Sequence, residues 1–254
     1  MSPISLDLTG KVALLTGAGR GIGLAIAHTF AAAGCAVAIQ DIDLSIATEA
    51  ARSIEAAGGR AIALDGDAGD LTLAKRVVDS TIAQLGGLHI LVNNAAIQRS
   101  VSWLEQDGDE MVKTFTTNVV SPILFCQLVT PIFRAQKWGR IINIGSIQGI
   151  RGNQHMLSYS LTKAAVSTMT RAMARDLGRD GITVNCIAPG WIAGTHRNRN
   201  DFDSDEDKLN KGKRIPVGRI GEPQDIANVA MLVASDAGSF INGQTYLVDG
   251  GASA

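Results

Sequence analysis

The segment KVALLTGAGRGIG, residues 11–23, decides the fold. The apolar run KVALLT leads directly into a turn with glycines at 17, 19, 21 and 23, and the following residues, 21–34, have the pattern of a helix that ends at a glycine. The fingerprint G-x-G-x-x-G is not matched, because Ile22 stands where its third glycine would be. The spacing Gly17-x-x-x-Gly21-x-Gly23 still brings backbone N–H groups at a helix N-terminus close to a pyrophosphate. An ordinary glycine-rich turn is the alternative, and the position between a strand and an amphipathic helix favours the binding loop.

Short apolar segments alternate with helical patterns along the rest of the chain. Further strands are expected at 35–40, 61–66, 89–96, 140–146, 182–190 and 244–250. Helices are expected at 44–59, 71–87, 156–178 and 222–234, with a long helical region that ends near 137 and a polar loop at about 191–214. The strands are apolar throughout rather than alternating, which predicts burial on both faces. The sequence therefore predicts a single domain, residues 1–254, of the α/β class: a three-layer doubly wound parallel sheet, the Rossmann fold.

The composition limits the class of protein. Hydrophobic residues make up 46% of the 254 residues and the net charge is −1, so no field favours nucleic acid or an anionic membrane. Cys35, Cys126 and Cys186 form no CxxC pair and are expected to be buried thiols in a reducing cytosol. The N-terminus lacks the pattern of a signal peptide, and the most apolar stretch, VVSPILFCQLVTPIF, is too short to span a bilayer. We expect a soluble cytoplasmic protein, and the histidine spacings predict no metal site.

Asp41 ends the second predicted strand, where a carboxylate binds the adenosine ribose hydroxyls in dinucleotide sites. The same carboxylate repels the 2′-phosphate of NADP, at a cost of about 4 kcal/mol per unit of phosphate charge at ~4 Å and an effective dielectric constant of ~20. Arg20 could attract the 2′-phosphate, but one arginine offsets only one carboxylate and leaves no net attraction. NAD is therefore the expected cofactor and NADP the less favoured one. A helix N-cap is the other role open to Asp41, although Asp43 is better placed for it.

Tyr159 and Lys163 are four residues apart in a predicted helix, so they lie on the same face. A surface helix with a half-buried ring and a solvated lysine is the ordinary explanation of such a pair. A tyrosine pKa is about 10 in water, and a lysine ammonium nearby favours the phenolate. The pair therefore has the chemistry of a general acid/base if the fold brings it to a cofactor.

Several motifs occur in a fixed order, and together they resemble the short-chain dehydrogenase/reductase family over essentially the whole chain. They are TGAGRGIG (16–23), Asp67 after the third strand, NNAA (93–96), Asn118 in TTNVV, Ser146 in INIGS, Tyr159-x-x-x-Lys163 and PGWI (189–192). The resemblance implies a hydride transfer between a nicotinamide cofactor and a secondary alcohol or ketone.

The resemblance also assigns roles. It implies that Tyr159 is the general acid/base, that Lys163 supports it and binds the nicotinamide ribose, and that Ser146 hydrogen-bonds the substrate oxygen. Asn118 would hold a water that belongs to a proton relay, and the alternative role for Asn118 is a buried side chain that hydrogen-bonds backbone groups. The alternative role for Ser146 is to cap the next segment. The expected cofactor-binding residues are Gly17, Arg20, Gly21, Ile22, Gly23, Asp41, Asp67, Ala68, Asn94, Ala95, Tyr159, Lys163, Pro189 and Ile192.

The substrate is the least determined part. In this family the segment between the serine and the tyrosine lines the substrate cleft; here it is IQGIRGNQHML (147–157), made polar by Gln148, Arg151, Asn153, Gln154 and His155. We expect Ser146, Gln148, Asn153 and Tyr159 to contact a sugar, polyol or sugar acid. The alternatives are an NADP-dependent 3-oxoacyl or other carbonyl reductase and, more distantly, a non-catalytic dinucleotide-sensing protein. The resemblance implies that residues 191–214 form a lid over the substrate. Thr195 stands one position beyond the place where the family usually has a threonine. The resemblance also implies a homotetramer.

Overall fold

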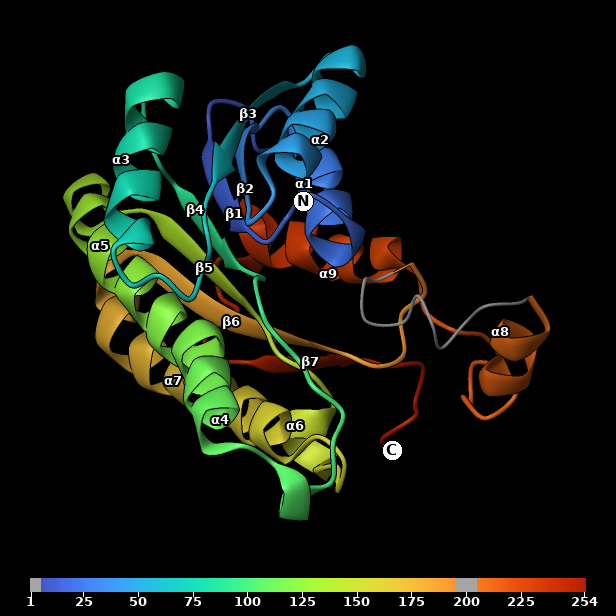
Figure 1. The fold of residues 1–254 in the computed structure, drawn as a ribbon. Coiled ribbons are helices and arrows are strands. Elements are labelled where there is room, and N and C mark those ends of the chain that lie inside the picture. Colours follow the sequence, from blue (N-terminus) through green and yellow to red (C-terminus); the bar gives the residue numbers. More distant parts are fainter. Residues whose placement is uncertain (1–5, 195–204) are drawn as a thin grey trace.

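Seven strands form one parallel sheet in the order β3-β2-β1-β4-β5-β6-β7 (Figure 1). The computed structural model describes residues 6–194 and 205–254. The strands are β1 (Val12–Thr16), β2 (Ala36–Asp41), β3 (Arg60–Asp65), β4 (Ile90–Asn93), β5 (Gly139–Ile144), β6 (Ile182–Pro189) and β7 (Thr245–Val248). The chain reverses its direction of travel across the sheet between β1 and β4, and such a switch point opens a crevice at the carboxyl ends of the strands.

Helices cover both faces of the sheet, as the sequence predicts. They are α1 (Gly21–Ala32), α2 (Leu44–Ala56), α3 (Leu73–Leu85), α4 (Gly108–Phe115), α5 (Ser121–Gln136), α6 (Gln148–Arg151), α7 (Leu157–Leu177), α8 (Asp205–Gly212) and α9 (Pro223–Ala234). Short helical turns occur at Trp103–Glu105, Thr116–Val120, Gly178–Asp180 and Asp236–Gly238. Figure 1 shows α1, α2 and α9 on one face and α3, α5 and α7 on the other, which makes the three layers of a doubly wound single domain.

The core has one cluster of buried side chains on each face of the sheet. Phe30 of α1 is buried against strand residues and α9 on one face, and Phe125 and Phe133 of α5 are buried with residues of α3 and α7 on the other. Close approach is needed at the start of β5, where a Cβ at Gly139 would lie 2.3 Å from the Phe133 ring. The large apolar area removed from water on both faces fixes the positions of the strand ends, where the site lies.

The long helical region before residue 137 is two α-helices joined by a π-helical turn, Thr116–Val120. The combined run, Gly108–Gln136, has 29 residues and is long and apolar enough to cross a membrane by length and composition alone. In this fold it supplies core residues such as Phe125 and Val129, which pack against the sheet and α3. The core accounts for part of its apolar character, and Val112 and Val120 of the same run are exposed. The π turn places Asn118 at the interior of the molecule.

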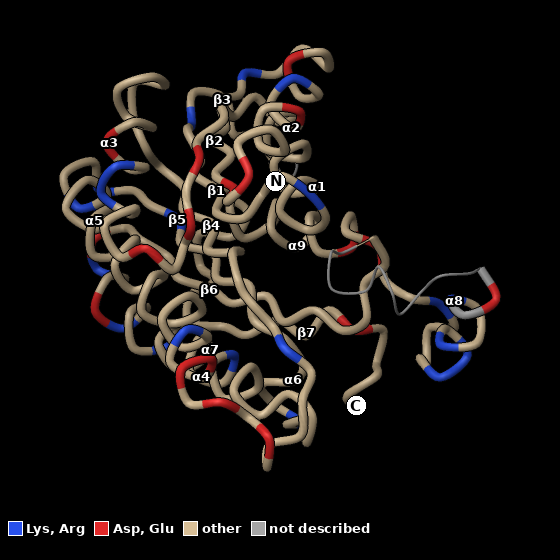
Figure 2. Tube along the Cα trace, in the orientation of Figure 1, with Lys and Arg blue, Asp and Glu red and all other residues tan. Residues whose placement is uncertain are grey.

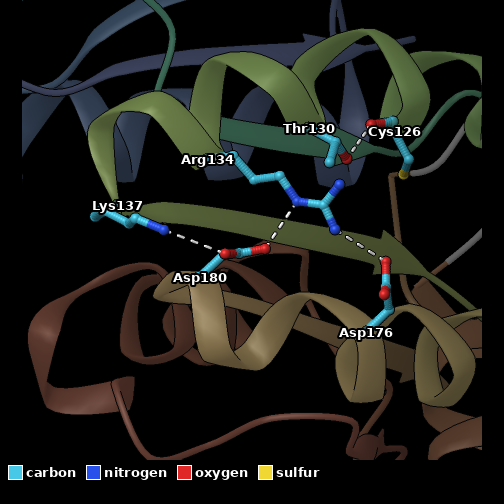
Figure 3. A network of polar contacts seen from close by, with 6 residues as sticks. All are labelled: Cys126, Thr130, Arg134, Lys137, Asp176 and Asp180. Carbon is cyan, nitrogen blue, oxygen red and sulfur yellow. Dashed lines mark hydrogen bonds and ion pairs between the residues drawn. The ribbon is translucent and has the colours of Figure 1, made fainter.

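An ionic network joins the C-terminal ends of α5 and α7 (Figure 3). Arg134 donates to Asp180 through Nε at 2.7 Å and to Asp176 through Nη2 at 3.2 Å, and Lys137 lies 3.3 Å from Asp180. The hydrogen bond from Arg134 is the main reason why the pKa of Asp180 lies below its usual range. Asp176 and Lys137 are largely exposed and Arg134 and Asp180 partly so, and ion pairs in such positions add little to the free energy of unfolding.

Two expectations about the elements are wrong. Not all strands are buried on both faces: β3 and β7 are the sheet edges, β7 is only half-buried, and Leu247 is 46% exposed. The polar segment 191–214 is not entirely loop, because it contains α8; residues 195–204 of the predicted lid, with Thr195, lie outside the described residues. A segment so polar gives no apolar periodicity from which α8 could be predicted.

Candidate active site

The glycine turn after β1 forms a cradle that only glycine can build. Gly17 and Gly21 have positive φ angles of 57° and 58°. A Cβ at Gly17 would lie 2.8 Å from Ala95 Cα, and a Cβ at Gly23 would lie 2.6 Å from Ala18 Cα. Arg20, the N-cap of α1, makes no capping side-chain bond, so the first N–H groups of α1 are left for a ligand. This geometry fits a pyrophosphate at a helix N-terminus.

Three polar side chains at strand ends hold the cradle in place. The Asn94 amide donates to the carbonyls of Thr16 and Gly17 at 3.0 and 2.7 Å, and the Thr16 hydroxyl accepts from the N–H groups of Asn94 and Ala95, both at 3.1 Å. Gln40 accepts from the Gly17 N–H at 3.2 Å and donates to the Gly66 carbonyl at 2.6 Å. Sequence reasoning missed Thr16 and Gln40, although a polar residue at the end of an apolar strand is the signal that could have found them.

The adenosine end of the crevice is acidic. Asp41 is 8% exposed and its Oδ2 accepts from the Gly19 N–H at 3.0 Å. Asp43 is the N-cap of α2, and hydrogen bonding from Ser45 lowers its pKa, with a smaller contribution from the charge of Arg20. Arg20 therefore lies close enough to Asp43 to interact with it electrostatically. The carboxylates of Asp41 and Asp43 and the guanidinium of Arg20 together give this end a net charge of −1. Asp67 lies at the end of the next strand, where its Oδ1 accepts from the Gly69 N–H at 2.8 Å.

Three of the four predicted catalytic residues, Ser146, Tyr159 and Lys163, line one cavity, whereas Asn118 does not line it. Tyr159 and Lys163 of α7 are 3% and 2% exposed, and Lys163 Nζ lies 5.6 Å from the centre of the Tyr159 ring. Lys163 Nζ also donates to the Ile144 carbonyl at 2.6 Å, which ties α7 to the end of β5. Ser146 follows β5, lines the cavity and accepts from the Gln148 N–H at 3.2 Å, although the N-cap position of α6 is Ile147.

Gly149 sets how closely this wall is packed. A Cβ at Gly149 would lie 2.6 Å from the backbone carbonyl carbon of Lys163, so α6 rests directly on the backbone of α7. The turn that carries Ser146 and the helix that carries Tyr159 are thereby held in a fixed relation. Close packing of this kind is the means by which catalytic groups are preorganised.

The Asn118 side chain hydrogen-bonds backbone groups, which is the alternative to the water relay that the sequence left open. Its Oδ1 accepts from the Ile97 N–H at 2.8 Å, and its Nδ2 donates to the Ile97 carbonyl at 2.9 Å and to Thr162 Oγ1 at 3.1 Å. The side chain is 1% exposed. It therefore joins the segment after β4 to α7, and the water relay stays a prediction.

One cavity of about 610 Å³ connects the cradle to the catalytic wall. It is lined by every predicted cofactor and substrate residue except Gly23, which supports the cradle from behind: Gly17, Arg20, Gly21, Ile22, Asp41, Asp67, Ala68, Asn94, Ala95, Ser146, Gln148, Asn153, Tyr159, Lys163, Pro189 and Ile192. A lining that joins a glycine cradle, acidic side chains and the catalytic wall fits a dinucleotide. Among the described residues, no group of three or more His, Cys, Asp or Glu side chains is arranged to hold a metal ion.

The substrate end differs from the sequence expectation in three side chains. Gln148 and Asn153 line the cavity, but Arg151, Gln154 and His155 do not. Arg151 donates to the Ala252 carbonyl at 2.9 Å and the other two contact each other at the surface. The reason is that α6 and the following turn present only part of their length to the crevice. Further side chains on the cavity that sequence reasoning missed are Ile97, Gln98, Met156, Trp191 and Lys211.

The fold and the cavity define an oxidoreductase that binds a nicotinamide dinucleotide at the carboxyl edge of a doubly wound sheet. The family model described as enoyl-(acyl carrier protein) reductase matches residues 17–253. The chain is 38% identical over 257 residues to galactitol 2-dehydrogenase of Agrobacterium fabrum, covering 97% of this chain and 98% of that protein. It is 38% identical to the 3-oxoacyl-[acyl-carrier-protein] reductase FabG of Staphylococcus aureus, covering 95% and 97% of the two chains.

A solved structure gives the same result. The gluconate 5-dehydrogenase of Burkholderia cenocepacia, in complex with NADP and tartrate, superposes with a TM-score of 0.90 and 35% identity, covering 97% of this chain and 96% of that one. This chain belongs to the short-chain dehydrogenase/reductase family, and it is a dehydrogenase or reductase that acts on CH–OH groups.

Proposed function

We propose that this protein is an NAD(H)-dependent oxidoreductase that interconverts a secondary alcohol and a ketone in a polyhydroxy compound. The observation that carries the proposal is the wall on which Ser146, Tyr159 and Lys163 face the same cavity as Gln148 and Asn153. The bound nicotinamide supplies the hydride acceptor or donor. Tyr159 exchanges the proton at the alcohol oxygen, and the Ser146 hydroxyl hydrogen-bonds the same oxygen. Lys163, buried beside the Tyr159 ring, favours its phenolate electrostatically.

The preference for NAD rests on the charges at the adenosine end. Asp41 is held by the Gly19 N–H with its carboxylate on the cavity, and Arg20 is balanced by Asp43. The 2′-phosphate of NADP would add up to two further negative charges beside this net negative group. The NADP in the Burkholderia cenocepacia enzyme argues in the opposite direction. We therefore test the two cofactors in parallel.

The polyhydroxy substrate class rests on the polar side chains of the substrate end. Gln98, Gln148 and Asn153 offer amide donors and acceptors to hydroxyl groups, while Met156 and Trp191 cover the carbon skeleton. The names of two similar proteins, galactitol 2-dehydrogenase and gluconate 5-dehydrogenase, agree with this class.

An NADP-dependent 3-oxoacyl or other carbonyl reductase is the second candidate. Arg20 on the cavity and the similarity to the Staphylococcus aureus reductase favour it. A non-catalytic dinucleotide-sensing role is a distant third, because Ser146, Tyr159 and Lys163 are all present on one wall. The proton-transfer residues would have no purpose in a sensor.

We further propose a cytoplasmic homotetramer that binds neither nucleic acid nor membranes. Apolar side chains are exposed on two separate surfaces: Val112, Val120 and Leu161 on α4, the π turn and α7, and Phe240 and Leu247 beside β7. Two separate apolar surfaces are what a symmetric tetramer needs. The three cysteines are free and buried, which suits a reducing compartment.

The test is the absorbance of the reduced nicotinamide, with NAD and NADP in parallel, against sugars, polyols, sugar acids, simple secondary alcohols and 3-oxoacyl thioesters. Turnover of a polyhydroxy compound with NAD supports the proposal. Turnover of thioesters with NADP alone would establish the second candidate. Absence of turnover with every compound, together with tight cofactor binding, would favour the sensor.

A further inference from the structure

The segment that follows β7, residues 249–254, is folded into an ordered turn near the substrate end. The Asp249 carboxylate accepts from the N–H groups of Gly251 and Ser253, both at 2.9 Å. Gly250 and Gly251 have positive φ angles of 63° and 85°, which glycine adopts without strain. The structure describes all of residues 249–254, and none of them lines the cavity. Any effect of this turn on a substrate is therefore indirect.

One side of the turn packs against the residues that follow α8. The Val217 N–H donates to the Gly250 carbonyl at 3.1 Å. A Cβ at Gly250 would lie 2.7 Å from Cγ2 of Ile215, whose side chain is buried. A few residues further on, the Gly221 N–H donates at 3.0 Å to the carbonyl of Trp191, a residue of the cavity wall. The turn thus supports the segment that holds the backbone of Trp191.

The other side of the turn holds α6. Arg151 Nη1 donates to the Ala252 carbonyl at 2.9 Å, and α6 begins with Gln148, which lines the cavity. Residues 250–254 have no charged side chain, and Figure 2 accordingly shows the trace in tan up to the end marked C, so this bond goes to the backbone and is not an ion pair. In Figure 1 the same end lies between α6 and α8.

The start of the turn rests on the segment after β6. A Cβ at Gly190 would lie 2.6 Å from the Cβ of Asp249, and the Gly190 N–H donates to the Val248 carbonyl at 3.0 Å. Gly190 lines the cavity next to Trp191. Three segments around the substrate end, α6, residues 190–192 and residues 215–217, therefore meet on this one turn. Packing this close leaves little room for them to shift relative to one another.

We propose that the turn 249–254 positions the substrate end of the cavity, and that Arg151 is the positioning residue through which it holds α6. Arg151 does not line the cavity and acts through Ala252. A substrate must meet the α6 wall and the catalytic groups at the same time, so a looser α6 weakens substrate binding. The packing of Gly149 on α7 still holds the catalytic wall, so the proton transfer is less affected. The inference goes beyond the proposed function, because it concerns any CH–OH compound that binds in this site.

The experiment compares the wild type with Arg151→Gln, Arg151→Lys and Gly250→Ala. Each is assayed for KM and kcat with the best compound of the substrate panel and for Kd of the reduced cofactor. Hydrogen exchange of the backbone amides in α6 and in residues 215–221 is measured as well, because it needs no substrate. Arg175→Gln is the matched control for the arginine, since Arg175 is exposed on α7 and does not line the cavity. Gly58→Ala is the control for the glycine: its φ of 86° brings similar backbone strain, but a Cβ there meets nothing within 4 Å.

We expect Arg151→Gln to raise KM by about 2- to 10-fold, the effect of one hydrogen bond, with kcat and the cofactor Kd nearly unchanged and faster exchange in α6. Arg151→Lys keeps a cationic donor and should recover part of the loss. Gly250→Ala should raise KM further and speed exchange in residues 215–221. Both controls should match the wild type in KM and in the exchange of these segments.

Unchanged KM and exchange in Arg151→Gln and Gly250→Ala would overturn the inference. So would losses of kcat and cofactor affinity as large as the rise in KM, because these would indicate a general loosening of the fold. A Gly58→Ala variant as impaired as Gly250→Ala would assign the effect to backbone strain and overturn it too. Turnover only of compounds that lack several hydroxyl groups would refute the proposed function and leave this inference standing. If no compound is turned over, the exchange rates decide the inference by themselves.

Discussion

Replacing Asp41 by Asn should shift the cofactor preference from NAD toward NADP. The substitution removes one negative charge from the adenosine end and keeps an oxygen that can accept from the Gly19 N–H, the bond that Asp41 makes at 3.0 Å. The glycine cradle should therefore keep its shape, and the change in preference should be electrostatic.

The magnitude follows from the position of the carboxylate. Two unit charges ~4 Å apart interact by about 4 kcal/mol at an effective dielectric constant of 20. The crevice is open to solvent, and screening by salt and water reduces this to about 2 kcal/mol, which corresponds to a roughly 30-fold change in relative kcat/KM. Arg20 and Asp43 then offset each other, which leaves no net attraction for the 2′-phosphate, so we expect a shift in ratio and not a complete reversal.

The assay is kcat/KM for NAD and NADP with one substrate, together with Kd for NADH and NADPH by fluorescence. Asp65→Asn is the control, because Asp65 pairs with Asp41 in the β2–β3 register but faces Arg76 and does not line the cavity. An unchanged NAD/NADP ratio in Asp41→Asn would refute the electrostatic reasoning. The same shift in Asp65→Asn would mean that only the net charge of the surface matters.

Three further outcomes are expected. Tyr159→Phe should lower kcat by about 100- to 10,000-fold because it removes the proton-transfer group, while the Kd for NADH stays close to that of the wild type; full activity would disprove the acid/base role. Gly149→Ala places a Cβ 2.6 Å from the Lys163 carbonyl carbon and should cut kcat by about 10-fold or more, whereas Gly108→Ala, with nothing within 4 Å, should not. Asp180 has a pKa lowered mainly by Arg134, so its stabilising effect is complete above the unfolded pKa of about 3.9 and is lost as the pH falls through the folded value. Asp180→Asn should accordingly lose less Tm than the wild type between pH 5 and pH 2, measured by circular dichroism, and an equal loss would contradict the ion-pair argument.

The strand and helix positions were predictable where local pattern and burial agree. The run KVALLTGAGRGIG indicated a strand, a glycine cradle and a helix, and all three occur at these residues. The prediction was wrong for α8, whose residues have no apolar periodicity, and for the exposed edge strand β7. Burial of a strand depends on its neighbours, and a single sequence does not say which strand stands at the edge of the sheet.

The sequence by itself indicated the family, which the comparisons confirm, and the candidate catalytic residues, whose roles stay predictions. The signals are local patterns: the glycine spacing, the i, i+4 pair Tyr159 and Lys163, and a carboxylate after the second strand. Such patterns involve residues close in the chain, so they can be recognised from the sequence alone. Only the tertiary structure decided which side chains share the cavity. In the structure Arg151 does not line the cavity, the Asn118 side chain bonds to the Ile97 backbone, and Lys211 reaches the cavity from α8. The physical reason is that these contacts join residues far apart in the chain, and the packing of helices on the sheet fixes them rather than any propensity of the residues involved.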